Sequence, residues 1–186
     1  MMEMHLTPLT EGRPDPAGLT AREIAVYDFL EKLEIPFARM GHDAAETMEA
    51  CAEIDTRLGV RMCKNLFLCN RQKTEFYLLM MPGDKPFKTK DLSAQINSSR
   101  LSFAGAEDME EYLGLTPGSV SVTGLMNDTQ NKVKLLVDKD LMDSEYIGCH
   151  PNINTSSLKI KTKDIFEVFL PAVNHEFKIV ELIRYE

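Results

Sequence analysis

The sequence predicts an α/β (α+β) fold in which a mixed, mostly antiparallel sheet or a partly closed barrel is flanked by helices. Its 186 residues fit one compact domain with a continuous core. Hydrophobic residues make up 44% and charged residues 27%, which is ordinary globular usage and argues against a fibrous or disordered class. Short strand-like runs are interrupted by short helical stretches without the regular alternation of a doubly wound fold, and this favours a mixed sheet.

The first fifty-odd residues predict a lead-in and two helices. Residues 1–19 carry prolines and glycines without a period, so we expect a loosely ordered lead-in before a single domain over residues 20–186. A capping-box pattern, Thr20 with Glu23, begins a helix that ends after Ile35. The second helix is expected over about 46–58.

The rest of the chain predicts strands separated by short helices. Apolar runs that begin at Cys63 and at Phe76 flank the polar residues 70–75 and predict a hairpin of buried strands. Three more helices are expected: one capped by Thr89 and ending near Ile96, one over Ala106–Leu113, and one capped by Thr162 and ending near Leu170. Strand-like alternation is found at Val120 and Val122 and over Val133–Val137. Further strands are expected over Tyr146–Gly148, Ser157–Ile160 and Phe177–Leu182.

The charge balance limits the partners. A formal net charge of −8 argues against unspecific coating of nucleic acid, because affinity for the backbone comes from neutralised phosphates, and we expect no DNA partner. No apolar run approaches the roughly 18 residues that a membrane span needs. The candidates for a local RNA contact are clustered lysines, which could equally be solvated surface: Lys85, Lys88 and Lys90 in one segment, and Lys159 with Lys161 and Lys163 in another.

The four cysteines favour buried thiols over a metal site. Cys51, Cys63, Cys69 and Cys149 lack the spacing of a disulfide framework, and no N-terminal run resembles a signal peptide, so we expect free thiols in a cytoplasmic protein. Zinc ligands usually come in closer pairs than Cys63 and Cys69. Strand neighbours such as Cys149 and His150 point to opposite faces. We therefore expect no metal and no cofactor.

Polar residues at strand ends and turns are the remaining candidates, because a rigid scaffold aims such residues. Lys64 opens an apolar strand and is either a snorkelling edge residue or a positioned cation. His150 is either a turn histidine bonded to backbone or a site residue. Gly118 is either a simple turn glycine or an exposed amide that could hold a developing oxyanion. The sequence contains no serine-centred elbow, phosphate-binding glycine loop or helix with two histidines.

At these residues the sequence resembles the YbaK/ProX-type family of prolyl-tRNA editing domains. The resemblance covers roughly residues 20–182. It is carried by CKNLFL at 63–68, FYLLMMPGDKPFKTK at 76–90, RLSFA at 100–104, PGSVSV at 117–122 and GCHPNINTSSLKI at 148–160. One departure concerns the glycine loop, because family members often have a proline a few residues after the glycine, where this chain has Val122.

The resemblance implies a free-standing aminoacyl-tRNA deacylase, a cytoplasmic hydrolase whose substrate is mischarged tRNA and foremost alanine attached to tRNA(Pro). Water would cleave the ester with the help of a ribose hydroxyl, so no covalent nucleophile is required. The resemblance implies that Lys64 anchors the terminal nucleotide or the carbonyl region, and that Gly118 and Ser119 contact the ester oxygen. His150 would line the amino-acid pocket and exclude proline, and Asn152 and Thr155 would form hydrogen bonds in the pocket. Lys64 and the Gly118 amide are expected to converge on one small cavity that admits a methyl side chain.

Two other functions stay open at this stage. Val122 is compatible with a domain that has lost activity and acts as a tRNA-binding or amino-acid-sensing regulator. The same fold could also act on seryl- or cysteinyl-tRNA. Mischarged tRNA is the expected partner in the enzymatic cases, and prolyl-tRNA synthetase is a candidate source of it.

Overall fold

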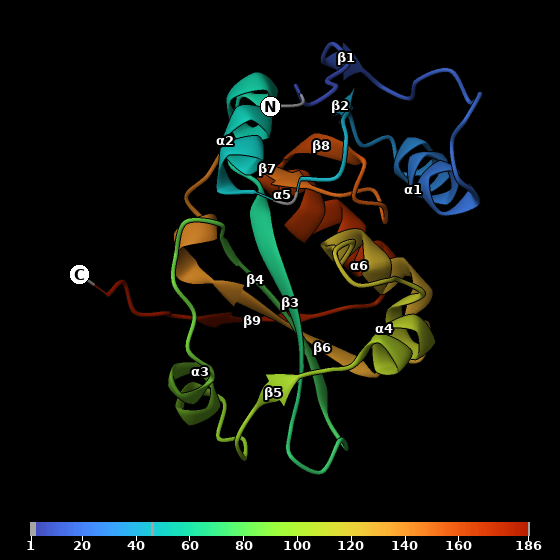
Figure 1. Cartoon of the computed structure of the whole chain (residues 1–186). Coiled ribbons are helices and arrows are strands. Elements are labelled where there is room, and N and C mark those ends of the chain that lie inside the picture. The colour runs from blue at the N-terminus through green and yellow to red at the C-terminus, as the bar shows by residue number, and fades with distance from the viewer. Residues whose placement is uncertain (1–2, 46, 186) are drawn as a thin grey trace.

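The computed structural model describes residues 3–45 and 47–185, which form two sheets and several helices (Figure 1). The four-stranded sheet is antiparallel and has the order β1 (Thr10–Glu11), β2 (Phe37–Gly41), β8 (Ser156–Lys161), β7 (Tyr146–Cys149). The five-stranded sheet is mixed and has the order β5 (Ser102–Phe103), β3 (Cys63–Cys69), β4 (Phe76–Pro82), β6 (Val133–Asp138), β9 (Phe177–Val180). The predicted fold class is confirmed, with two sheets in place of a closed barrel.

The helices flank these sheets. They are α1 (Ala21–Lys32), α2 (Met48–Leu58), α3 (Thr89–Gln95), α4 (Ala106–Leu113), the 3₁₀ turns η1 (Val122–Asn127) and η2 (Lys139–Leu141), and a continuous helix made of α5 (Thr162–Asp164), the π-helical turn η3 (Ile165–Phe169) and α6 (Leu170–Ala172). None of them, over residues 3–45 and 47–185, is long and apolar enough to span a bilayer.

Local signals placed most helix boundaries well. Thr20 caps α1 by accepting a hydrogen bond from the Glu23 N–H at 3.3 Å, and Gly59 ends α2 in the left-handed conformation. Helix α1 ends at Lys32, earlier than the predicted Ile35, because Glu34 already takes a positive φ of 57°.

Three predicted elements are wrong in type or extent. Val122 begins a 3₁₀ helix instead of a strand, because the Ser121 side chain caps it and Val122 is buried in the core. Thr89 is the first helical residue of α3 and not its cap, a position that Lys88 holds without a side-chain hydrogen bond. Thr162 is likewise the first helical residue and not the cap, a position that Lys161 holds, and the helix continues through the π-helical turn to Ala172.

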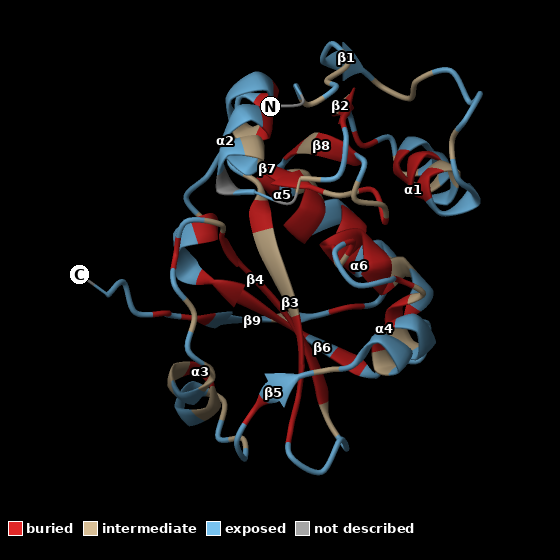
Figure 2. Ribbon diagram, in the orientation of Figure 1, coloured by how far each residue is buried: buried red, intermediate tan, exposed pale blue. Residues whose placement is uncertain are grey.

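Apolar side chains of both sheets meet in one main core, and Figure 2 shows the buried residues concentrated where the sheets and the helices face each other. A second cluster lies on the opposite side of the five-stranded sheet and includes Leu68, Leu79 and Leu92. The third cluster contains Ile54 and Leu58 of α2. Alternation along each strand therefore gives β3 two apolar faces, as expected for a buried strand.

A parallel bridge between Met62 and Gly148 joins the two sheets at one end. The Gly148 N–H donates to the Arg61 carbonyl at 3.2 Å. A Cβ atom on Gly148 would lie 2.8 Å from the Met62 sulfur and 3.1 Å from the Met62 Cα, so a side chain there would separate the chains. The bridge thus fixes where β3 starts relative to the end of β7.

Residues 3–19 are attached to the four-stranded sheet. Thr10 and Glu11 pair with β2, and Leu6 bridges to His42. Arg13 forms ion pairs with Asp28 and Glu31 of α1. The division of the chain into this lead-in and one domain stays a prediction.

Candidate functional site

Lys64 and His150 each lie two residues beyond the bridge that joins the sheets. Met62, the bridge residue before Lys64, packs in the cluster beneath α2 together with Leu58. Because side chains two apart on a strand share a face, Lys64 is directed to the same side of β3 as Met62. Its side chain is partly buried, and Nζ donates to the Lys85 carbonyl at 3.4 Å. A backbone carbonyl thus holds the predicted cation.

Hydrogen bonding fixes the tautomer of His150. Its Nδ1 lies 2.8 Å from the Ser156 carbonyl oxygen, which can only accept, so Nδ1 carries the proton and Nε2 keeps its lone pair. No residue in the described part of the chain hydrogen-bonds to Nε2. Burial lowers the pKa of His150, which therefore stays neutral at pH 7.

His42 is a neighbour of His150 that the sequence reasoning missed. Its ring centroid is 6.2 Å from that of His150, Nδ1 donates to the Asp43 carbonyl at 2.7 Å, and Nε2 accepts from the Ser157 hydroxyl at 2.8 Å. Burial lowers its pKa as well. The sequence signal was weak, because Arg39 interrupts the run before His42, whereas an uncharged run, Tyr146–Cys149, precedes His150.

The glycine loop is a tight turn with an exposed amide. The Ser119 N–H donates to the Thr116 carbonyl at 3.1 Å, and Gly118 has a φ of +88°, as the third residue of a type II turn requires. The Ser119 side chain is buried and bonds back to the Thr116 carbonyl at 2.7 Å. Within the described residues nothing accepts a hydrogen bond from the Gly118 N–H, which leaves this donor available.

The segment after His150 packs against the glycine loop. Asn152 is buried with a φ of +60°, and its Oδ1 lies 2.7 Å from Thr123 Oγ1, which is also 3.0 Å from the His150 carbonyl oxygen. A Cβ atom added to Gly118 would lie 3.5 Å from the Asn154 side-chain nitrogen. Thr123 of η1 thus ties the histidine segment to the element that follows the glycine loop.

A cavity of about 370 Å³ brings several of these residues together. Ser119 and Asn152 line it, with Gly118 next to Ser119 in the chain, and the N-terminal end of α1 closes the other side. Lys64 and His150 are outside its lining, and no hydrogen bond between described residues connects Lys64 to Gly118. Thr155 is exposed, and its carbonyl accepts from the His42 N–H at 2.9 Å. The predicted residues therefore form two groups, one around the bridge and one around this cavity.

A buried polar network lies behind His150. The Arg39 guanidinium and the Ser156 hydroxyl both donate to the Glu23 carboxylate, at 2.9 and 2.7 Å, and Arg39 also donates to the Ser156 hydroxyl oxygen at 2.7 Å. The Tyr27 hydroxyl donates to the same carboxylate at 2.5 Å. Because Ser156 supplies the carbonyl that orients His150, these charges hold the strand that positions the histidine.

The predicted RNA contacts separate into one buried and three accessible lysines. Lys85 is only 2% exposed, and its ammonium is paired with Asp138 and Asp140, so we correct its prediction as an RNA contact. Lys88 and Lys90 are exposed, and Lys159 is partly exposed with its ammonium 4.7 Å from the Tyr146 ring centroid.

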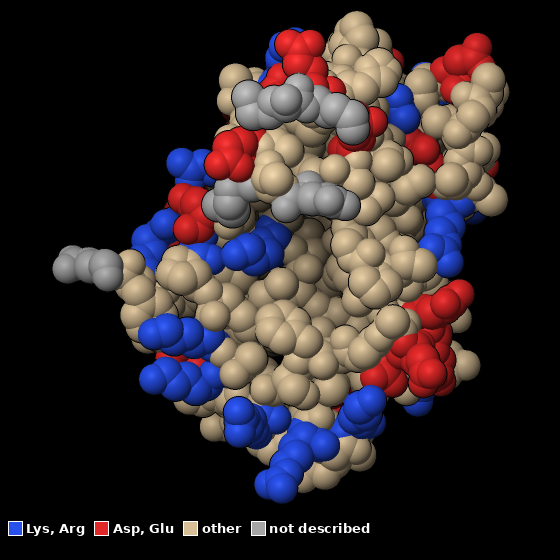
Figure 3. All heavy atoms as spheres, in the orientation of Figure 1, with Lys and Arg blue, Asp and Glu red and all other residues tan. Residues whose placement is uncertain are grey.

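Lys88 and Lys90 line a hollow of about 690 Å³ together with Arg100, Phe87 and Phe103. Phe103 is 62% exposed and packs edge-on against Phe87. Figure 3 shows lysines and arginines gathered along the edge of this face that carries α3 and the tip of the β3–β4 hairpin, whereas acidic residues gather over α4. The hollow combines cations with aromatic rings, which suits a strand of nucleic acid.

Burial makes two of the four thiols poor nucleophiles. The cysteines are free, and burial raises the pKa of Cys149 to about 12 and raises the pKa of Cys63 as well. Among residues 3–45 and 47–185 no three His, Cys, Asp or Glu side chains are grouped so that they could hold a metal ion. The groups that the structure offers for chemistry are therefore a cation, a neutral imidazole and a free backbone amide.

On this α+β domain, such groups are of the kind that can place a substrate and stabilise developing charge. The profile of the aminoacyl-tRNA editing domain matches residues 42–168. The chain belongs to this family, which confirms the resemblance inferred from the sequence and the predicted enzyme class, an aminoacyl-tRNA deacylase that hydrolyses an ester.

The relatives agree with this placement. The chain is 33% identical over 158 residues to the prolyl-tRNA editing protein ProX of Acetoanaerobium sticklandii, across 85% of this chain and 96% of that protein. It is 27% identical over 150 residues to the prolyl-tRNA synthetase associated domain-containing protein 1 of Danio rerio, across 80% of each. A solved structure described as a candidate trans-editing enzyme for prolyl-tRNA synthetase superposes with a TM-score of 0.66 at 14% identity, over 89% of this chain and 100% of that one, and shows the shared fold.

Proposed function

We propose that this chain is a trans-editing hydrolase of the cytoplasm that removes alanine from mischarged tRNA(Pro). The observation that carries the proposal is the family match together with a free Gly118 amide and a carbonyl-held Lys64 at the ends of rigid elements. The substrate is an ester that is already activated, so catalysis requires a placed water and stabilised charge more than a protein nucleophile.

The mechanism assigns one role to each group. The Lys64 ammonium anchors the terminal nucleotide or the carbonyl region of the ester. The Gly118 N–H, held by the turn that Ser119 closes, donates to the ester oxygen as negative charge develops there. A ribose hydroxyl of the substrate activates the attacking water. This mechanism requires Lys64 and Gly118 to approach the same substrate from the two groups of residues described above.

His150 supplies the size filter in this proposal. Its ring is held by the Ser156 carbonyl and backed by His42, so it cannot move aside readily for a larger side chain. The aminoacylation site of a synthetase gains only about 1–3 kcal/mol of discrimination between amino acids that differ by one methylene. A second site that excludes proline supplies the discrimination that the first site lacks. Asn152 and Thr155 are the secondary candidates for hydrogen bonds to the substrate.

The acceptor end of the tRNA would lie along the cationic hollow. Phe87 is two residues from the Lys85 carbonyl that holds Lys64, so the hollow begins next to the proposed anchor of the terminal nucleotide. Lys88, Lys90 and Arg100 would meet phosphates while the exposed Phe103 ring offers a base-stacking surface. Lys159 would be a separate, weaker contact.

Deacylation of alanyl-, cysteinyl-, seryl- and prolyl-tRNA(Pro) tests the proposal. We expect alanyl-tRNA to be hydrolysed fastest, Lys64→Ala to lower kcat/KM at least a hundredfold with an unchanged circular dichroism spectrum, and His150→Ala to admit prolyl-tRNA. Full turnover by Lys64→Ala would remove that lysine from the site. Continued rejection of prolyl-tRNA by His150→Ala would refute the filter.

A binding module without activity is the second candidate, and Val122 is the observation that favours it. Where relatives often have a proline, this chain has an apolar residue buried at the start of η1. If none of the four aminoacyl-tRNAs were turned over while uncharged tRNA still bound, the regulator would be the better description. Preferred hydrolysis of cysteinyl- or seryl-tRNA would instead change only the substrate.

A further inference from the structure

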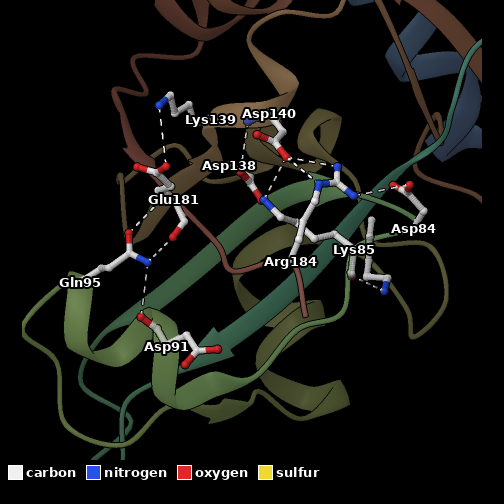
Figure 4. Close-up of polar contacts among 10 residues, drawn as sticks. Asp84, Lys85, Asp91, Gln95, Asp138, Lys139, Asp140, Glu181 and Arg184 are labelled. Atoms are coloured by element: carbon white, nitrogen blue, oxygen red, sulfur yellow. Dashed lines mark hydrogen bonds and ion pairs between the residues drawn. The ribbon is translucent and has the colours of Figure 1, made fainter. Parts of the chain in front are cut away.

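Lys85 forms a buried ion pair that the proposed chemistry does not use. Its ammonium lies 2.7 Å from Asp138 Oδ2 and 3.1 Å from Asp140 Oδ2, with the lysine side chain 2% and the Asp138 side chain 0% exposed. Figure 4 shows Lys85 reaching from the turn after β4 to these carboxylates at the end of β6. Asp140 is 41% exposed, and the hydrogen bond from Lys85 lowers the pKa of its carboxyl.

Stability alone is a poor reason for such a pair. Removing two charges from water costs about as much as their attraction returns, and apolar replacements are often as stable. What a buried pair can fix is one particular geometry. The ion pair holds the Lys85 side chain, and the Lys85 backbone in turn contacts Lys64, because the Lys85 carbonyl accepts the hydrogen bond from Lys64 Nζ at 3.4 Å.

Ion pairs nearer the surface also hold the turn that carries Lys85. Arg61 donates to Asp84 at 2.7 Å, and Arg184 of the C-terminal segment reaches both Asp84 at 3.7 Å and Asp140 at 3.1 Å (Figure 4). The turn is therefore held from the start of β3, from the end of β6 and from the C-terminal segment. Its backbone has little freedom to move relative to Lys64.

We propose that the Lys85–Asp138–Asp140 cluster positions Lys64 by fixing the carbonyl that directs its ammonium. This inference rests on the proposed function, in which Lys64 anchors the aminoacyl ester. Lys85 and Asp138 are positioning residues, since they do not contact the substrate themselves. A displacement of about 1 Å in a substrate-positioning group can lower a rate by about a hundredfold, so a small release of this turn would be measurable.

The test removes both buried charges at once, so that neither is left unpaired. Lys85→Met with Asp138→Asn keeps the approximate volumes, and the asparagine Oδ1 can still accept from the Asp140 N–H as Asp138 does at 3.1 Å. We expect the double variant to fold and its kcat for alanyl-tRNA to fall about ten- to hundredfold. We expect KM for the tRNA to change less than about twofold, because the pair does not touch RNA.

A spectroscopic readout separates positioning from support of the fold. In ¹³C NMR of the lysine ε carbons, the Lys64 signal is assigned by its absence from Lys64→Ala. The double variant should move that signal. The matched control is Lys134→Met with Glu75→Gln, an exposed pair at the other end of β6 with its charges 2.5 Å apart. It should leave both kcat and the Lys64 signal unchanged.

An unshifted Lys64 signal and wild-type kcat in a folded double variant would overturn the positioning role. If the double variant does not fold, Asp140→Asn gives the decision, because it weakens one of the two carboxylate partners at a half-exposed position. We expect it to lower kcat a few-fold and shift the Lys64 signal, and no change in either would overturn the role. Failure of the proposed function is distinguishable, because the wild-type protein would then hydrolyse none of the four aminoacyl-tRNAs, or Lys64→Ala would keep full activity. Failure of the positioning role alone leaves the wild-type protein active, Lys64→Ala inactive and the double variant unimpaired.

Discussion

At the scale of single residues, the neighbouring histidines His42 and His150 are held as neutral rings. Each donates Nδ1–H to a backbone carbonyl, and each has its pKa lowered foremost by burial. A neutral His150 agrees with its proposed place in the amino-acid pocket, because a neutral ring does not repel the protonated amino group of an aminoacyl ester. The two rings also limit the pH range in which the native state is stable.

This arrangement predicts that acid destabilises the fold through the histidines. Between the unfolded pKa near 6.5 and the lower folded pKa, the unfolded chain binds a proton that the native chain does not, so stability falls as pH drops through that window. Urea unfolding from pH 7.5 to 5 should show this slope. A His42→Gln variant should have a shallower slope, and an equally steep one would contradict the assignment.

Residues whose partners are near in sequence were predictable, and residues with distant partners were not. Thr20 was identified as a cap because its partner is three residues away. Glu23 was assigned to the same capping box, yet its carboxylate binds Arg39 and Ser156, the latter 133 residues away. Lys85 was predicted as an RNA contact because nothing near it in the sequence indicates Asp138, 53 residues later. Long-range pairing decides the role of a charged residue, and local pattern does not contain it.

At the scale of elements, hydrophobic periodicity located the β3–β4 hairpin and helix α4, because each is decided by contacts between near neighbours. The bridge between Met62 and Gly148 could not be inferred in this way. It brings together residues 86 positions apart, and only the structure shows why a glycine is required. The sequence placed the candidate site residues on strand ends and turns as the structure has them. The expected convergence of Lys64 and Gly118 on one cavity stays a prediction, because the cavity beside Ser119 is not lined by Lys64.

The bridge predicts a specific cost for a methyl group at Gly148. Gly148→Ala would place Cβ 3.1 Å from the Met62 Cα, so the backbone must shift, and overpacking of this kind costs about 1–3 kcal/mol of unfolding free energy. The control is Gly105→Ala at the start of α4, where the nearest atom is 3.8 Å away and we expect a loss below about 1 kcal/mol. Urea denaturation measures both, and equal effects would contradict the close approach.

At the scale of the whole molecule, the distribution of charge matters more than its sum. The net charge of −8 opposes RNA in general, yet cations gather over α3 and the hairpin tip while acids gather over α4 (Figure 3). An asymmetric field of this kind orients a polyanion during approach and keeps unspecific binding weak. The composition indicated that any RNA contact must be local, but the place of Arg100 and Phe103 beside Lys88 and Lys90 in one hollow is visible only in the structure.

Salt dependence of tRNA binding tests the proposed phosphate contacts of this hollow. The logarithm of the affinity for tRNA should fall linearly with the logarithm of the salt concentration, and each lost phosphate contact should reduce the slope by about 0.7–0.9. We therefore expect Lys88→Ala with Lys90→Ala to reduce the slope by up to about 1.8. The matched control, Lys134→Ala with Lys178→Ala, removes two cations from a different hollow beside β9 and should keep the wild-type slope. Because both double variants lose the same net charge, a general field effect would change the two slopes equally, and that outcome would exclude a local contact at α3.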